Sequence, residues 1–177
     1  MRAWPLARAW YRRWKLELPD TPDDPVWYFA YGSNMHSGTF RHRRRLSPSA
    51  WRIGRLPGYR LRFNLPGWPI GRAAPANVSL DEKAEVWGVL YCLTWRQLVW
   101  LNVTEGVPGR VYQPLSLPVV DAEGRTLPAI TYVADGAPED GRPSRRYITL
   151  LRDGAREHGL PEHWIAMLDA VDPAPGT

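Results

Sequence analysis

The segment Tyr28-Phe-Ala-Tyr-Gly-Ser-Asn-Met35 leads an aromatic strand candidate directly into a polar turn. Val26 to Tyr31 is short, aromatic and mostly apolar, which favours a β-strand. Gly32 permits a positive φ, and in that conformation the N–H groups of the turn can converge on one anion. Gly, Ser and Asn also serve simply as capping residues. The residues alone therefore leave two interpretations open: an anion-binding turn and a capped strand-to-helix connection.

Strand candidates dominate the chain beyond this turn. We predict strands at residues 51–64 (or a bent hairpin there), 85–93, 110–120 and 127–133, with a loop at 66–75. We predict helices at residues 37–45, 94–106 and 144–159, and a last helix from Pro161. Thr94 and Gln97 form a capping-box pattern, and Gly88 marks a close approach of backbone or ligand. Strands without regularly alternating helices predict an α+β fold.

Composition places the chain among globular proteins of one main domain. It has 177 residues, 44% hydrophobic and 23% charged, which argues against a disordered chain. No apolar run approaches the roughly 18 residues that span a bilayer, and no secretion signal precedes the domain. The single cysteine, Cys92, excludes an intrachain disulfide framework. We therefore expect a soluble protein of the reducing cytoplasm.

The net charge of +5 is concentrated at the N-terminus. Five of the 23 Lys and Arg residues lie within residues 1–15, which hold no acid, so the remainder has 18 basic and 18 acidic residues. A neutral body gives no reason to expect a nucleic-acid partner. The basic run Phe40 to Arg45 is expected to be the solvated face of a helix, and the four histidines have no spacing typical of a metal site.

We divide the chain into an N-terminal extension and proline-rich linker (1–25), a folded domain (26–172) and a short tail (173–177). Within residues 1–15, apolar side chains recur at helical spacing opposite the basic ones. The favoured interpretation is that this segment docks on its own domain or on a second copy, as in a homodimer, or that it precedes the natural start. An interfacial helix on anionic lipid is the less favoured alternative.

Four motifs, in order and spacing, resemble the γ-glutamylcyclotransferase family. They are Tyr28 to Met35, Val86-Trp-Gly-Val-Leu-Tyr91, Leu101-Asn-Val-Thr-Glu-Gly-Val107 with Tyr112, and Pro143-Ser-Arg-Arg-Tyr147 with Glu157-His-Gly-Leu-Pro161. The resemblance covers roughly residues 26–172. It draws attention to Glu105, because a lone Glu before a helix-ending Gly would otherwise be read as a solvated surface residue.

The resemblance implies a small mixed β-barrel flanked by short helices, which releases 5-oxoproline from a small γ-glutamyl substrate without metal or cofactor. It implies that Glu105 is the acid/base carboxylate. The substrate-binding residues that it implies are Tyr31, Gly32, Ser33, Asn34, Met35, Tyr112, Tyr132 and Tyr147. The chain departs from the family at Asn102, where members commonly carry Asp; this difference concerns the support of the helix before Glu105.

This chemistry needs few protein groups, because the nucleophile belongs to the substrate. The substrate's α-amine attacks its own γ-carbonyl, and one carboxylate can take the proton from the ammonium and return it to the departing amine. Backbone N–H groups of residues 32–34 would hold either the oxyanion or the α-carboxylate.

Three alternatives remain open from the sequence. The enzyme could remove a γ-glutamyl protecting group from a biosynthetic intermediate with a large amine. The domain could be a catalytically idle binding module of the same fold. Glutathione ranks lower as a substrate, because the glutathione-specific branch usually has a different sequence around the glycine of the turn.

Overall fold

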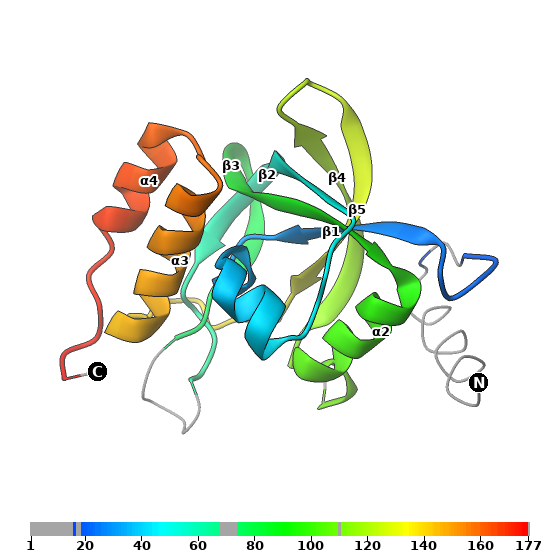
Figure 1. Ribbon diagram of the computed structural model, residues 1–177. Helices are drawn as coiled ribbons and strands as arrows, with labels where there is room; N and C mark the ends of the chain where they lie inside the picture. Colours follow the sequence, from blue (N-terminus) through cyan, green and yellow to red (C-terminus); the bar gives the residue numbers. More distant parts are fainter. Residues whose placement is uncertain (1–15, 17–18, 68–73, 110, 177) are drawn as a thin grey trace.

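The computed structural model describes residues 16, 19–67, 74–109 and 111–176, whose strands form one closed barrel (Figure 1). The strands are β1 (Pro25–Ala30), β2 (Ala50–Arg62), β3 (Asn77–Thr94), β4 (Gln113–Asp121) and β5 (Thr126–Val133). Their order around the barrel is β1-β3-β2-β4-β5. β1 meets β5 in parallel through one pair, Tyr28 with Ile130, and the other pairings are antiparallel. The predicted small mixed barrel with flanking helices is confirmed.

Short helices connect and flank the strands. They are the 3-10 helix η1 (Ser33–Met35), the π-helix η2 (Gly38–Arg43), α2 (Trp95–Thr104), the 3-10 helix η3 (Val107–Gly109), α3 (Arg145–Glu157) and α4 (Glu162–Asp169). Figure 1 shows α3 and α4 packed together on one side of the barrel, with α2 on the other. η1 packs against α3, so the C-terminal helices support the polar turn that follows β1.

β2 and β3 form a ribbon longer than the sequence indicated. β3 begins at Asn77, eight residues before the predicted start, because Asn77 pairs with Arg62 at the far end of β2. The 51–64 segment is one strand with a bulge between Pro57 and Tyr59, and not a hairpin. Proline has no N–H for the ladder, and Gly58 takes a φ of +76°, which accommodates the extra residue.

The predicted helix ends agree closely with the structure. The Thr94 hydroxyl accepts from Gln97 N, and the Gln97 side chain accepts from Thr94 N at 2.9 Å, so α2 begins with a capping box. Gly106 ends it with a φ of +69°. The Ser144 hydroxyl caps α3. The predicted 37–45 helix differs in type, because its centre is the π-helix η2.

The barrel interior is fully buried around Phe29, Leu56 and Leu90. Gly88 allows β1 and β3 to approach closely, since a Cβ there would lie 2.3 Å from the carbonyl oxygen of Ala30. The expected close approach at Gly88 is confirmed, and it is made by backbone. Cys92 is a free cysteine, half-buried on β3.

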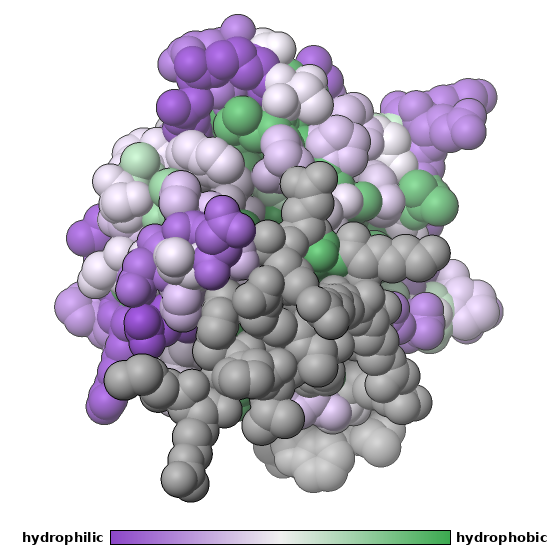
Figure 2. Space-filling model, turned by 90° about the vertical axis from the view of Figure 1, so that its right-hand side faces the viewer, coloured by the Kyte–Doolittle hydropathy of each residue, from purple (hydrophilic) through white to green (hydrophobic). Residues whose placement is uncertain are grey.

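The surface carries a few large apolar side chains between hydrophilic ones. In Figure 2, outside the residues drawn in grey, green patches are small and separated by purple and white residues. Trp51 and Trp100 are about half exposed, which accounts for two of the ten tryptophans. In the part of the chain that is described, no helix has both the length and the apolar character to cross a bilayer. The N-terminal helix predicted within residues 1–15 lies outside the described residues, as does most of the 66–75 loop.

Candidate active site

A small cavity of about 40 Å³ lies at the end of β1, beside the turn that begins at Gly32. Its walls come from β1, η1, the residues just before β3 and β4, the end of α2, β5 and α3. The lining residues are Tyr28, Tyr31, Gly32, Ser33, Asn34, Ala76, Glu105, Tyr112, Tyr132 and Tyr147. The structure therefore brings together eight of the nine site residues named from the sequence, and adds Tyr28 and Ala76.

Met35 is the predicted site residue that the structure does not place in the cavity. Its side chain is fully buried in the hydrophobic core, and its carbonyl oxygen accepts a hydrogen bond from the Tyr91 hydroxyl at 3.2 Å. We correct the expectation accordingly. Met35 anchors the end of the turn, because an apolar side chain that follows a polar turn is free to enter the core.

Gly32 is needed for a different reason from the one expected. Its φ is −112°, so the turn does not use a left-handed conformation at this position. A Cβ at Gly32 would lie 3.1 Å from the Tyr147 hydroxyl oxygen. The absence of a side chain thus keeps the turn and the α3 tyrosine close together on one wall of the cavity.

Glu105 lies at the C-cap of α2, and its carboxylate turns toward the cavity. Its side chain is only 14% exposed. Asn34 Nδ2 donates to Glu105 Oε1 at 3.0 Å, and Arg44 Nη2 lies 2.8 Å from the same oxygen. The carboxylate that the family resemblance singled out is therefore shielded, hydrogen-bonded and paired with a cation.

Arg44 and Tyr28 are the functional candidates that sequence reasoning missed. Arg44 is half-buried, although the basic run that contains it was expected to be solvated. Nothing in a run of five basic residues distinguishes the inward one, because that depends on the geometry of η2. Tyr28 could have been predicted as a site residue, since it begins the motif Tyr28 to Met35. Its hydroxyl accepts a hydrogen bond from Asn34 Nδ2 at 2.9 Å.

The tyrosines of the cavity are fixed by hydrogen bonds to backbone and core groups. The Tyr31 hydroxyl donates to the carbonyl of Tyr132 at 2.5 Å, and the Tyr112 hydroxyl donates to the carbonyl of Ala76 at 2.7 Å. The Tyr147 hydroxyl instead accepts from the N–H of Ala76 at 3.1 Å. These bonds give the cavity rigid aromatic walls before any substrate arrives.

Tyr132 connects the cavity to Asn102, the position where the chain departs from the family that it resembles. The Tyr132 hydroxyl donates to Asn102 Oδ1, and the Asn102 side chain is fully buried in α2. An amide oxygen accepts this bond as a carboxylate would, without placing a second negative charge near Glu105. The departure at Asn102 therefore keeps the link between β5 and the helix that carries Glu105.

Burial holds Tyr28 and Tyr147 of the cavity in their neutral form. Burial raises the pKa of Tyr147 to about 12; the Ala76 N–H bond opposes the rise and the Glu105 charge adds to it. Burial likewise raises the pKa of Tyr28 well above its usual value, and the negative charge of Glu105 adds to that effect. Glu105 is thus surrounded by hydroxyls that stay protonated at neutral pH.

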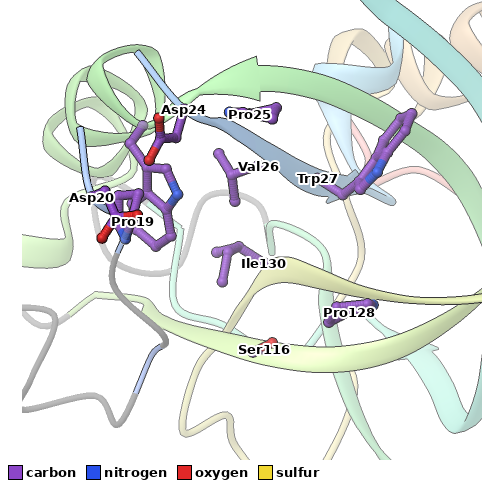
Figure 3. A pocket seen from close by; sticks show the side chains of 10 residues that line it. Pro19, Asp20, Asp24, Pro25, Val26, Trp27, Ser116, Pro128 and Ile130 are labelled. Carbon is purple, nitrogen blue, oxygen red and sulfur yellow. The ribbon is translucent and has the colours of Figure 1, made fainter. Parts of the chain in front are cut away.

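A second, larger cavity of about 470 Å³ shares no lining residue with the first (Figure 3). It lies between β1 and the β4–β5 hairpin, where Val26 and Ile130 point into the same space. Its two carboxylates are Asp20 and Asp24. The pKa of Asp24 is lowered by hydrogen bonds from the side chain and backbone of Thr21, so Asp24 caps a turn. The smaller cavity is the better candidate for acid/base chemistry.

A small β-barrel with one shielded carboxylate among tyrosines fits an acid/base enzyme. Comparisons with known proteins point to the same class of protein. The model of the AIG2-like family matches residues 85–168. γ-Glutamyl cyclotransferase aclK of Aspergillus oryzae is 35% identical over 178 residues, which is 86% of this chain; the chain spans only 64% of that relative. The γ-glutamylcyclotransferase of Homo sapiens is 31% identical over 86% of this chain and 82% of its own length.

Solved structures of this family also resemble the chain. A γ-glutamyl cyclotransferase superposes with a TM-score of 0.79 at 26% identity, covering 87% of this chain and 92% of its own. YkqA from Bacillus subtilis superposes with a TM-score of 0.72 at 24% identity over 85% of this chain, which supports the fold. The chain belongs to the γ-glutamylcyclotransferase family, a family of enzymes.

Proposed function

We propose that the protein is a cyclotransferase that converts a γ-glutamyl amino acid or γ-glutamyl amine to 5-oxoproline and the free amine. The observation that carries this proposal is the placement of Glu105. It is the one acidic residue among the ten that line the small cavity, and it faces the turn that the family resemblance assigns to the γ-glutamyl group. Glu105 would act as the acid/base group.

The reaction then needs one carboxylate that relays protons. At neutral pH the substrate's α-amine is mostly an ammonium, and Glu105 accepts its proton so that the nitrogen can attack the γ-carbonyl carbon. The new C–N bond closes the five-membered ring. As the tetrahedral intermediate collapses, Glu105 returns the proton to the departing nitrogen and the old C–N bond breaks. The ring nitrogen gives up its second proton through the same carboxylate, so the lactam keeps one N–H and the amine leaves as an ammonium. No cysteine, serine or lysine nucleophile is required.

The walls of the cavity support cyclisation over hydrolysis. Tyrosine rings and the Asn34 side chain line the cavity closely, so a γ-glutamyl group bound among them would displace the water that could compete with the amine. The fixed tyrosines favour a curled chain in which the amine already lies near the carbonyl, and such orientation can lower the barrier substantially. The proposal therefore names 5-oxoproline, and not free glutamate, as the product.

The test is release of 5-oxoproline from a panel of γ-glutamyl amino acids, γ-glutamyl amines, γ-glutamyl conjugates of large amines, and glutathione. We expect turnover of one class, and a loss of about 10²–10⁴-fold in Glu105→Gln, which keeps the size of the side chain but not the base. Glu82→Gln, an exposed position on β3, is the matched control and should retain activity.

The outcomes separate the alternatives. Undiminished activity in Glu105→Gln would remove Glu105 from the mechanism. Turnover of large-amine conjugates alone would favour removal of a protecting group. If the folded protein releases no 5-oxoproline from any substrate of the panel, a binding module would be favoured. Glutathione ranks low, since the glutathione-specific γ-glutamyl cyclotransferase from yeast shares the fold with this chain but only 13% of its residues.

A further inference from the structure

Arg44 makes a separate contact with each of its three guanidinium nitrogens. Nη2 lies 2.8 Å from Glu105 Oε1, Nη1 donates to the carbonyl of Thr104 at 3.0 Å, and Nε donates to Asn34 Oδ1 at 3.3 Å. Together with the bond from Asn34 to Glu105, these contacts form a closed ring of three side chains. A planar guanidinium with fixed donor directions suits such a ring.

The ring fixes the orientation of the Asn34 amide. Arg44 can only donate, so the atom of Asn34 that faces Nε has to be the carbonyl oxygen. The amide NH₂ group of Asn34 must then face Glu105, where it donates to Oε1. With Arg44 removed, the Asn34 carbonyl oxygen would lose this donor and Glu105 would lose its cation, so the ring would open on two sides.

The fold delivers Arg44 to this place through the π-helix η2. The N–H of Arg44 donates to the carbonyl of Thr39 at 2.9 Å, which is the five-residue spacing of a π-helix. Arg45 then takes a φ of +56°, the one positive φ among the non-glycine residues described. Trp100 Nε1 donates to the carbonyl of Arg44 at 2.9 Å. The position of Arg44 is therefore fixed by three features: the π-helix before it, the left-handed residue after it, and the bond from Trp100 to its carbonyl.

The two carboxylate oxygens of Glu105 differ in their contacts. Arg44 and Asn34 both bind Oε1, and no described residue donates to Oε2. We propose that Arg44 is a positioning residue: it holds Glu105 by Oε1, directly and through Asn34, so that Oε2 is presented to the α-ammonium of the substrate. This inference rests on the proposed cyclotransferase function and deepens it, because it separates the oxygen that is held from the oxygen that reacts.

The test compares Arg44→Met, Arg44→Lys and the control Arg43→Met, an exposed change on the same π-helix. With the γ-glutamyl substrate that the panel selects, we expect Arg44→Met to lower kcat by about 10²-fold while KM stays near the wild-type value. Arg44→Lys should recover part of kcat, because an ammonium can reach Oε1 but cannot make all three contacts. Arg43→Met should match the wild type.

Two kinetic results would overturn the inference. One is an Arg44→Met enzyme with wild-type kcat. The other is a rise in KM at constant kcat, which would make Arg44 a contact for bound substrate and not a support for Glu105. In both cases the wild-type protein is active. The proposed function would then be kept, and only the positioning role of Arg44 would be rejected.

A second measurement does not depend on activity. Melting temperatures of Arg44→Met, Glu105→Gln and the double variant form a cycle. We expect Glu105→Gln to shift the melting temperature less in the Arg44→Met background than in the wild type, because the pair has already been broken. Additive shifts would contradict the pairing. If the wild-type protein releases no 5-oxoproline, the proposed function fails while this cycle still decides whether Arg44 holds Glu105.

Discussion

Gly154→Ala is a change in α3 that should damage the site by moving the turn packed against the helix. A Cβ at Gly154 would lie 2.6 Å from His36 N and 2.7 Å from the carbonyl carbon of Met35. The turn backbone would have to retreat by about 0.8 Å to restore an ordinary contact of 3.4 Å. Asn34, which donates to Glu105, immediately precedes this backbone.

The stability cost of Gly154→Ala should be modest and the functional cost large. Overpacking costs about 1–3 kcal/mol, and replacing a helical glycine by alanine returns about 1 kcal/mol, so we expect a net loss of roughly 0–2 kcal/mol. A displacement near 1 Å at a reacting group can cost about 10²-fold in rate. Urea unfolding and 5-oxoproline release measure the two effects separately.

Asp153→Ala, at the exposed neighbouring position of α3, is the control for helix propensity. It should leave both stability and activity near wild type. Wild-type activity in Gly154→Ala, with an unchanged unfolding midpoint, would refute the reasoning, because it would mean that the turn is not held in place by close contact with α3.

Three further predictions concern the barrel and the cavity walls. Gly88→Ala should lower stability by at least about 2 kcal/mol, because its Cβ would meet the carbonyl of Ala30 at 2.3 Å; an unchanged urea midpoint would contradict this. Asn102→Leu should cost about 1–3 kcal/mol by removing the buried acceptor of the Tyr132 hydroxyl, which thermal unfolding would detect. Tyr147, whose folded pKa is raised to about 12, contributes stability that is complete below pH 10 and is lost as the pH rises from 10 to 12. Absorbance at 295 nm should show delayed tyrosine ionisation in the folded protein, and a titration identical to that of the urea-unfolded chain would refute it.

Local patterns predicted the parts of this fold that local interactions determine. Thr94 and Gln97 indicated the start of α2, and the capping box is present. Gly88 indicated a close approach, and the backbone of β1 makes it. The full length of β3 could not be predicted from the sequence. Its first residues are ordered by pairing with β2 and not by apolar character of their own.

The candidate site was predicted only as far as its family motifs extend. Those motifs selected Glu105 and the tyrosines, whose placement around one cavity needs contacts between distant segments. They could not show that Gly32 is required by the nearness of Tyr147, since that contact joins residues more than a hundred positions apart. Arg44 escaped notice because its inward direction depends on a π-helix, and a basic run does not indicate that helix type.

The bond between the Tyr31 hydroxyl and the carbonyl of Tyr132 spans 101 residues. The cavity therefore combines the first strand of the barrel with α3, the helix that follows the last strand and carries Tyr147. A nascent chain that stops before α3 could pair its strands but would have no complete pocket. A ligand of this pocket would accordingly bind only chains in which α3 has joined the barrel, and would stabilise the fold by an amount that grows with the logarithm of the ligand concentration above Kd.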